Sequence, residues 1–355
     1  MKKYHLGIVF SGGGAKAAAH CGALQALKEY GVKADVLAGT SAGAMVAAFH
    51  SAGIEPKRMI ELCADKTFFR DMATPSRPRG GIFDSSPMLN FIRENMPYRN
   101  IEDLPVPVHI VASDMDHGKV KVFSKGEIAP RLVASCSIPV MFKPMVIGGV
   151  HYIDGGVFQN LPVPTIRNMC EEVIAFSVRR MEEEKYKDSL LFTATRAYSM
   201  MFMSNIMADS RLADHFIELN TDGYSVYDLS KTPELFRQGY ADACRALENI
   251  GYERIMPPES IEFNIPEEES EDRQKRLRAR REYFEERVRE LGSETIERIS
   301  ERIAERAERR AERRAKRSGK GTYYVVKGLT KGSFMDAMIV DTVVVAKRID
   351  IKDFL

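Results

Sequence analysis

Short apolar runs alternate with stretches of helical spacing along the first part of the chain. The run Leu6–Phe10 predicts a buried strand, and after a glycine-rich loop Ala15–Tyr30 predicts a helix that ends at Gly31. A second strand is predicted at Val32–Ala38, and a helix of small residues at Ser41–Ser51. Strands and helices that alternate in this way favour a parallel sheet with helices on its faces.

The later segments continue the same pattern. Four further strand segments are expected at Val106–Ala112, Lys119–Phe123, Val146–Ile153 and Glu172–Val178. The third of them contains Gly148-Gly149, which suits a tight hairpin turn. Asp114–Gly118, between the first two, is a better hairpin turn than a metal loop. Further helices are predicted at Leu191–Asp209 and Glu234–Ile250.

The helix predicted at Leu191–Asp209 is rich in methionine, at positions 200, 201, 203 and 207. Methionine adapts to flexible acyl chains, so a surface that contacts lipid is one interpretation. A helix of this kind more often belongs to a protein core, and we expect core here.

Beyond Pro266 the composition changes abruptly. Residues 267–320 hold 15 acidic and 18 basic side chains, and their apolar residues follow helical spacing on both sides of Gly292-Ser293. We therefore divide the chain into a first domain at 1–260, a charged amphipathic helical segment at 261–320 and a short β-rich segment at 321–355. The segment Arg302–Arg317 has only Ile303 and alanines on its apolar side, which favours homo-oligomerisation through 267–320 over lipid binding. A solvated helical hairpin is the third interpretation of these helices.

Charge and cysteine content exclude several classes of protein. The formal net charge is only +2, so nucleic acid is not an expected partner. The five cysteines are scattered singly, which argues against a disulfide framework and a zinc site and fits a reducing compartment. The first apolar run is too short for a signal peptide, and no run is long enough to span a bilayer. We expect a cytoplasmic protein, with peripheral membrane contact as a secondary expectation.

The sharpest chemical motif is Gly39-Thr40-Ser41-Ala42-Gly43, a GxSxG sequence between a predicted strand and a predicted helix. A serine on such a sharp turn needs very small neighbours, and Gly39 and Gly43 meet that need. An ordinary helix-capping serine is the alternative when GxSxG stands alone. The strand-to-helix context favours a nucleophile.

A second loop, Ser11-Gly12-Gly13-Gly14-Ala15-Lys16, follows the first predicted strand. Consecutive glycines let backbone N–H groups converge on an oxyanion or a phosphate. The loop also satisfies the weak GxGxxG/A fingerprint of dinucleotide-binding proteins, but the acidic residue expected at the end of the second strand is missing. If the glycine loop binds an oxyanion beside a nucleophilic serine, both this loop and the GxSxG loop have a role. Nucleotide binding would account for the glycine loop alone.

The base that would activate Ser41 is less obvious. Ser41 follows only two predicted strands, which counts against an α/β-hydrolase, and His215 is the one histidine that follows the best acid candidate. Its surroundings resemble a helix-to-strand junction, where a histidine is more often structural. The acid candidate is Asp154, which ends a predicted strand and precedes Gly155-Gly156.

Together, these motifs resemble the patatin-like phospholipase family. Its GGGxR/KG loop, GxSxG nucleophile and DGG base correspond in order to Gly12–Ala17, Gly39–Gly43 and Asp154–Gly156, and Asn160-Leu161-Pro162 and the block Ala134–Pro139 also match. The similarity covers about residues 3–254. Ala17 and Ser137 depart from the family pattern, each replacing one small residue by another.

The resemblance implies a three-layer α/β fold with a mostly parallel sheet, and a phospholipase A or lipid esterase activity. It implies Ser41 as nucleophile, Asp154 as base in a Ser–Asp dyad, and no metal or cofactor. The implied oxyanion donors and supporting residues are Gly12, Gly13 and Gly14, and Lys16, Gly39, Gly43, Gly155 and Gly156. A lipid ester is the implied substrate. Nucleotide binding by the Gly12–Gly14 loop, or a non-catalytic role for the charged arm, remain the alternatives.

Overall fold

The computed structural model describes residues 2–64, 83–180, 183, 185–186, 190–226 and 228–263. Residues 264–355 lie outside the described part. They hold almost all of the predicted helical arm, with its oligomer contact, and the whole predicted β-rich segment. Those features, and the division of the chain at residue 260, stay predictions.

Within the described residues, eight strands form one sheet in the order β5-β6-β3-β2-β1-β7-β8, with β4 paired to β3. The parallel strands are β1 (Tyr4–Phe10), β2 (Val36–Thr40), β3 (Val108–Asp114), β7 (Cys170–Ser177) and β8 (His215–Glu218). The antiparallel strands are β4 (Lys119–Phe123), β5 (Met145–Ile147) and β6 (Val150–Asp154). The expected mostly parallel sheet is confirmed.

One edge of β3 is shared by two strands that run toward each other. β2 pairs with it in parallel and ends with Thr40 opposite Val111, while β6 pairs in antiparallel fashion and ends with Asp154 opposite Ala112. β4 covers both stretches of β3 from the other edge. Since Val111 and Ala112 are consecutive, the ends of β2 and β6 meet.

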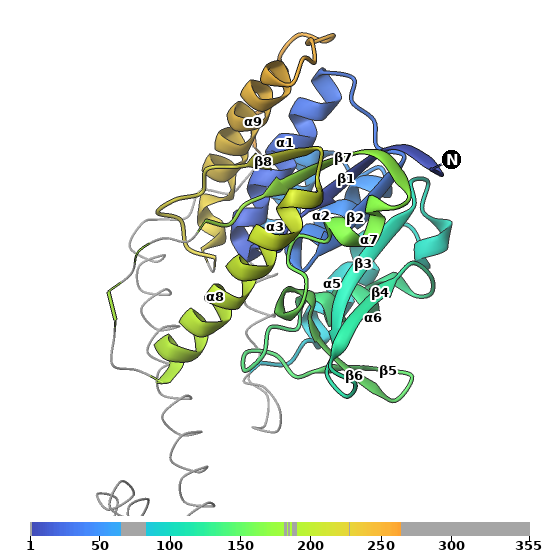
Figure 1. The fold of residues 1–355 in the computed structure, drawn as a ribbon, viewed down its shortest axis with the longest axis vertical. Coiled ribbons are helices and arrows are strands. Elements are labelled where there is room, and N and C mark those ends of the chain that lie inside the picture. Colours follow the sequence, from blue (N-terminus) through green and yellow to red (C-terminus); the bar gives the residue numbers. More distant parts are fainter. Residues whose placement is uncertain are drawn as a thin grey trace, which may run out of the picture. The chain divides into compact units, whose positions relative to one another are not determined.

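Helices cover both faces of the sheet (Figure 1). On one face lie α1 (Ala18–Glu29), α2 (Ala42–Ser51), α3 (Pro56–Ala64), α5 (Ser86–Asn95), α6 (Ile128–Cys136) and α9 (Thr232–Asn249). On the other face lie α7 (Val163–Arg167) and α8 (Leu190–Asp209). The alternation of side chains along β1 fits this arrangement, because the Phe10 ring contacts His20 of α1 whereas Val9 packs under α7.

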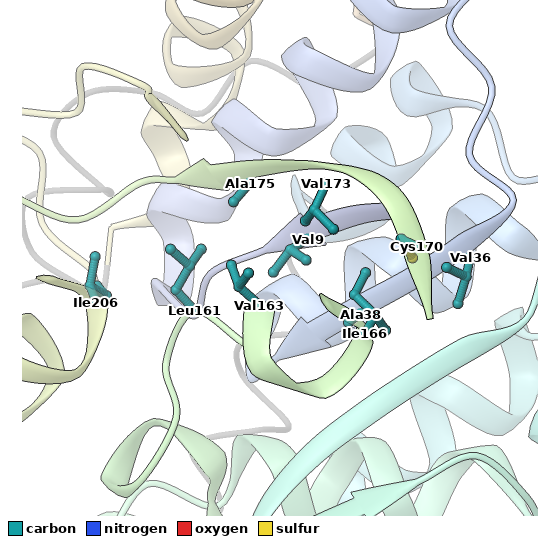
Figure 2. Close-up of a cluster of buried hydrophobic side chains, with 10 residues drawn as sticks. All are labelled: Val9, Val36, Ala38, Leu161, Val163, Ile166, Cys170, Val173, Ala175 and Ile206. Atoms are coloured by element: carbon teal, nitrogen blue, oxygen red, sulfur yellow. The ribbon is translucent and has the colours of Figure 1, made fainter. Parts of the chain in front are cut away.

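The core on the α7 side is built from alternate residues of the three central strands (Figure 2). Its members are Val9, Val36, Ala38, Leu161, Val163, Ile166, Cys170, Val173, Ala175 and Ile206. All ten are almost completely buried. This core anchors the segment after β6 to the sheet, because Leu161 is part of it.

Most predicted elements are confirmed, with shifts that have local causes. The second strand begins at Val36 rather than Val32, because the Asp35 carboxylate accepts the N–H groups of His5 and Leu6 at the start of β1. The first helix opens with a 3-10 turn at Gly14–Ala17. The predicted hairpin folds at Gly148 and Gly149, both with positive φ. The helices α3, α5, α6 and α7 and the strand β8 are missing from the prediction.

The core expectation for the methionine-rich helix is wrong for three of its methionines. Met200, Met201 and Met207 of α8 are exposed by 57%, 45% and 60%, whereas Phe202 and Ile206 are buried. Apolar residues lie on all sides of α8. Because the sheet covers only one side of the helix, the apolar residues on the other side remain exposed. Among the described residues, no helix has the length and apolar character that crossing a membrane requires.

Candidate active site

Ser41 stands at the turn between β2 and α2 in a conformation that is rare for a residue with a side chain, with φ 55° and ψ −130°. The turn is crowded by backbone on both sides. A Cβ on Gly39 would lie 2.5 Å from the Gly43 carbonyl oxygen, and a Cβ on Gly43 would lie 2.4 Å from that of Ser11. The two glycines are therefore required for space, as the GxSxG motif predicts.

The strained turn is held by a serine from α6. The backbone N–H of Ser41 donates to Ser135 Oγ at 2.8 Å, and the Ser135 hydroxyl donates to the Val111 carbonyl oxygen at 2.6 Å. This chain of hydrogen bonds ties the nucleophile turn to β3. Ser135 belongs to the family-like block of the sequence, but its partner could not be inferred there because the two serines are 94 positions apart.

Asp154 directly contacts Ser41. The Ser41 hydroxyl donates to Asp154 Oδ2 at 2.7 Å, and the Gly156 N–H donates to Oδ1 at 2.8 Å. The backbone of Asp154 is fixed as well, because its N–H donates to the Ser137 carbonyl oxygen and its carbonyl oxygen accepts from the Ser113 hydroxyl. Both oxygens of the carboxylate thus have a partner, and one of them faces Ser41.

Burial gives Asp154 the character of a base. Its side chain is 1% exposed, and this desolvation raises the pKa of the carboxyl to about 6, although the Ser41 and Gly156 hydrogen bonds act in the opposite direction. A carboxylate with this pKa remains ionised at neutral pH. It is also a stronger proton acceptor than an exposed aspartate.

The glycine-rich loop lies against the nucleophile, but its three N–H groups are not equivalent. The Gly12 N–H donates to the Asn160 carbonyl oxygen at 3.1 Å, so in this structure it already has an acceptor, and the oxyanion role expected for Gly12 stays a prediction. For the N–H groups of Gly13 and Gly14, no acceptor occurs among the described residues. A Cβ on Gly12 would lie 3.1 Å from Ser41 Cβ, so the loop borders the nucleophile directly.

His20 holds the first residue of this loop. His20 is fully buried, its Nε2–H donates to the Ser11 carbonyl oxygen at 3.0 Å, and burial lowers its pKa to about 4. The ring is therefore neutral at pH 7, and it fixes the residue that begins the loop. Lys16 is also buried, within the 3-10 turn. His20 escaped the sequence analysis because its role depends on a backbone carbonyl and not on a motif.

Cys136 adds a thiol to the site. Burial, together with the charge of Asp154, raises the pKa of the Cys136 thiol well above its usual range, although nearby Ser41 acts in the opposite direction. The thiol therefore stays protonated. The sequence analysis counted this cysteine only as one of five single thiols.

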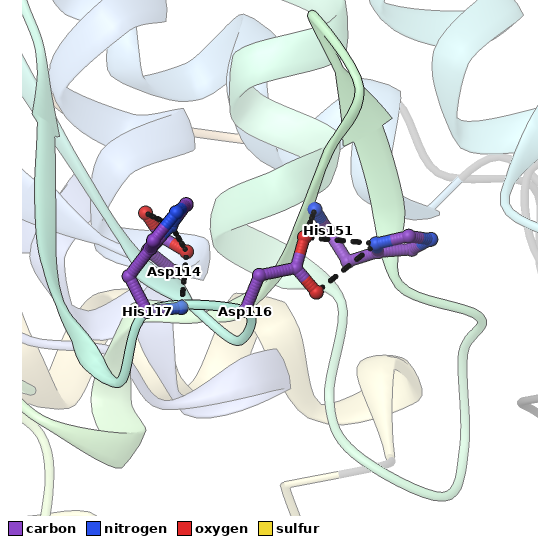
Figure 3. A network of polar contacts seen from close by, with 4 residues as sticks. All are labelled: Asp114, Asp116, His117 and His151. Atoms are coloured by element: carbon purple, nitrogen blue, oxygen red, sulfur yellow. Dashed lines mark hydrogen bonds and ion pairs between the residues drawn. The ribbon is translucent and has the colours of Figure 1, made fainter.

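The remaining histidine candidates lie elsewhere. His215 lies on β8, which β7 and β1 separate from β2, and its Nε2 pairs with Glu172 Oε1 at 3.0 Å. His117 and His151 pair with Asp114 and Asp116 at the β3–β4 turn and the start of β6 (Figure 3). The predicted hairpin turn at Asp114–Gly118 is confirmed. The described residues contain no group of three acidic, histidine or cysteine side chains suited to a metal ion.

Comparison with known families agrees with this geometry. Residues 8–166 match the family model named patatin-like phospholipase, and this stretch includes the glycine loop, Ser41 and Asp154. This stretch of the chain is therefore similar to the patatin-like phospholipase family. The family is one of carboxylic ester hydrolases.

Similar proteins match about half of this chain and differ from it in how much of their own length the match covers. An uncharacterized NTE family protein of Mycobacterium bovis is 31% identical over 185 residues, which cover 51% of this chain and 51% of that protein. Patatin-like phospholipase domain-containing protein 6 of Mus musculus is 30% identical over 196 residues, covering 52% of this chain and 14% of that protein. The crystal structure of VipD from Legionella pneumophila covers 70% of this chain and 67% of that chain, at 17% identity and a TM-score of 0.41. The chain thus spans about half, or less, of these two curated relatives.

Proposed function

We propose that the protein is a serine acyl hydrolase that cleaves carboxylic esters of lipids, with a dyad of Ser41 and Asp154. The observation that carries the proposal is the 2.7 Å hydrogen bond from the Ser41 hydroxyl to a buried carboxylate whose pKa is raised to about 6. A nucleophile bonded to a base that is ionised at neutral pH is the arrangement that acyl transfer requires.

The first half of the reaction acylates the serine. Ser41 Oγ attacks the ester carbonyl carbon while its proton passes to Asp154 Oδ2, and the carbonyl oxygen becomes an oxyanion. The N–H groups of Gly13 and Gly14 bind that oxyanion, since they have no acceptor among the described residues. The protonated Asp154 then gives its proton to the leaving alcohol, and the acyl group stays on Ser41.

The second half releases the acid. A water molecule takes the place of the alcohol and loses a proton to Asp154 as it attacks the acyl carbon. The second tetrahedral intermediate collapses, Ser41 Oγ recovers a proton from Asp154, and the carboxylic acid leaves. An alcohol is a better leaving group than an amine, so the dyad suits esters better than amides.

The raised pKa of Asp154 also bears on the nucleotide alternative. A phosphate group would bring negative charge beside a buried carboxylate, whereas a neutral ester carbonyl would not. In addition, the Gly12 N–H, which a dinucleotide fingerprint would direct to the pyrophosphate, is occupied by Asn160. Both observations favour ester hydrolysis.

We also propose that the outer side of α8 contacts the lipid surface from which the substrate comes. Met200, Met201 and Met207 are exposed there, and Arg196 and Asp209 are the helix's two charged residues. The inner side of the same helix touches the turn after the base, because Asn205 Nδ2 donates to the carbonyl oxygens of Gly156 and Val157. Flotation with phosphatidylcholine vesicles should fall when Met200 and Met201 are both changed to serine, and equal flotation would contradict the contact.

The function is tested by fatty acid release and by labelling of the serine. The wild-type protein should release fatty acid from phosphatidylcholine vesicles and react with a fluorophosphonate probe, and Ser41→Ala should do neither. Absence of both reactions in the wild-type protein, together with saturable binding of ADP, would favour the nucleotide alternative instead.

A further inference from the structure

The side-chain amide of Asn160 is buried and makes no hydrogen bond with the described residues. The residue is 1% exposed, and neither Nδ2 nor Oδ1 of its carboxamide has a hydrogen-bond partner among the described residues. A buried amide without partners costs free energy, and most buried polar groups in proteins are paired. The hydrogen-bonding capacity of this amide is therefore left unused by the described residues.

The carboxamide lies between the two loops of the catalytic site. A Cβ on Gly12 would lie 2.9 Å from Asn160 Nδ2 and 3.1 Å from Ser41 Cβ. A Cβ on Gly156 would lie 2.7 Å from the same Nδ2. The amide thus borders the glycine loop on one side and the turn that holds Asp154 on the other, close to the nucleophile.

The backbone around Asn160 holds the amide in place. The Asn160 carbonyl oxygen accepts the Gly12 N–H, and the carbonyl oxygen of the preceding residue, Gln159, accepts the Thr40 hydroxyl at 2.7 Å. The next residue, Leu161, is fully buried in the core cluster of Figure 2. Each neighbour of the side chain is therefore fixed, which is the condition for a preorganised donor.

Resting on the proposed function, we infer that the Asn160 carboxamide donates a hydrogen bond to the ester carbonyl oxygen as this becomes the oxyanion on Ser41. The carbonyl oxygen of Asn160 accepts the Gly12 N–H, so this N–H is not available to an oxyanion. The side-chain Nδ2 of the same residue lies beside Gly12 and provides a donor in its place. The oxyanion is then bound by Gly13, Gly14 and Asn160. Asn160 is a catalytic residue in this assignment, because it touches the reacting atom.

The experiment compares Asn160→Ala and Asn160→Asp with the wild-type full-length chain on p-nitrophenyl butyrate. Asp has the shape of Asn but offers an acceptor and a negative charge in place of the donor. Both variants should lower kcat by about 10²- to 10³-fold, with KM changed by less than about threefold. Labelling of Ser41 by a fluorophosphonate should slow to a similar extent, because its phosphoryl oxygen occupies the same site.

Asn95→Ala is the matched control, since Asn95 Nδ2 donates to the Phe91 carbonyl oxygen within α5, away from the site. It should leave kcat unchanged. If Asn160→Ala does not fold, as judged by circular dichroism, the isosteric Asn160→Asp variant decides.

Two results would overturn the inference. Folded Asn160 variants that keep kcat within about threefold would make the amide a ligand for a structural water. Variants that lose kcat but are labelled at the wild-type rate would assign Asn160 to deacylation and not to the oxyanion. Failure of the proposed function would give a different result. In that case Ser41→Ala would hydrolyse the ester as fast as the wild-type protein, whatever the Asn160 variants do.

Discussion

Ser41 and Asp154 lie side by side because β2 and β6 approach each other along one edge of β3. Ser41 directly follows β2, and Asp154 is the last residue of β6. Thr40, at the end of β2, pairs with Val111, and Asp154, at the end of β6, pairs with the next residue, Ala112. Sheet register thus brings Ser41 and Asp154 together. Their 2.7 Å contact requires no movement of a loop.

The pKa of Asp154 predicts the pH dependence of catalysis. The carboxyl must be ionised to accept the proton of Ser41, and burial raises its pKa to about 6. We therefore expect kcat/KM for p-nitrophenyl butyrate to be half-maximal near pH 6, to fall about tenfold per pH unit below it, and to be level above it. A profile that rises only at a clearly higher pH would show that another group is the base.

Ser135 predicts an effect on both stability and rate. In Ser135→Ala, the N–H of Ser41 loses its acceptor inside the protein, which should cost about 1–3 kcal/mol of unfolding free energy. The turn of Ser41 would also loosen, so we expect kcat to fall about tenfold or more.

Ser137→Ala serves as the control for Ser135→Ala. The Ser137 hydroxyl donates to the Val133 carbonyl oxygen, one turn earlier in the same segment, and does not touch Ser41. Urea denaturation and steady-state kinetics on both variants provide the comparison. If both variants lost the same unfolding free energy and the same fraction of kcat, the specific role of Ser135 would be contradicted.

His20 predicts a loss of stability in acid. Its pKa is about 4 in the folded protein against an ordinary value of 6.5, so the unfolded chain takes up the proton first as the pH falls. The contribution of the neutral ring to the free energy of unfolding is fully present above pH 6.5. It is lost as the pH falls from about 6.5 to about 4, and the total loss is up to roughly 3 kcal/mol.

The effect of His20 is isolated by comparing the wild-type protein with His20→Gln. Asp154 acts in the opposite direction, because its pKa is raised on folding and its contribution to stability falls as the pH rises from about 3.8 to about 6. Since Asp154 is present in both proteins, its effect cancels in the difference. The stability advantage of the wild-type protein should shrink from pH 7 to pH 4.5, and a constant difference would contradict this account.

The sequence predicted the parts of the site that depend on local motifs. Gly39 and Gly43 around Ser41, and Gly155-Gly156 after Asp154, are needed where the backbone approaches its neighbours, and such needs are visible in the sequence. Strand boundaries were close because the apolar runs are buried on both faces of a parallel sheet.

The contacts of three supporting residues were not predicted, although the family-like parts of the sequence include Ser135 and Asn160, and the reason is common to all three. Ser135, His20 and Asn160 act on backbone groups of residues distant in the chain, and pairings of this kind have no periodicity or fixed spacing. The exposed methionines of α8 were misjudged because methionine surrounds the helix. Only the position of the sheet decides which side is buried.

The most direct test of the account is kcat/KM for p-nitrophenyl butyrate in three single variants, each shown to be folded by circular dichroism. Ser41→Ala and Asp154→Asn should reduce the rate at least about 10³-fold, while His215→Ala should stay within about threefold of the wild-type protein. The reason is that Asp154 contacts the nucleophile, whereas His215 pairs with Glu172 on a distant strand. Full loss of activity in folded His215→Ala, or wild-type activity in Asp154→Asn, would contradict the Ser41–Asp154 dyad.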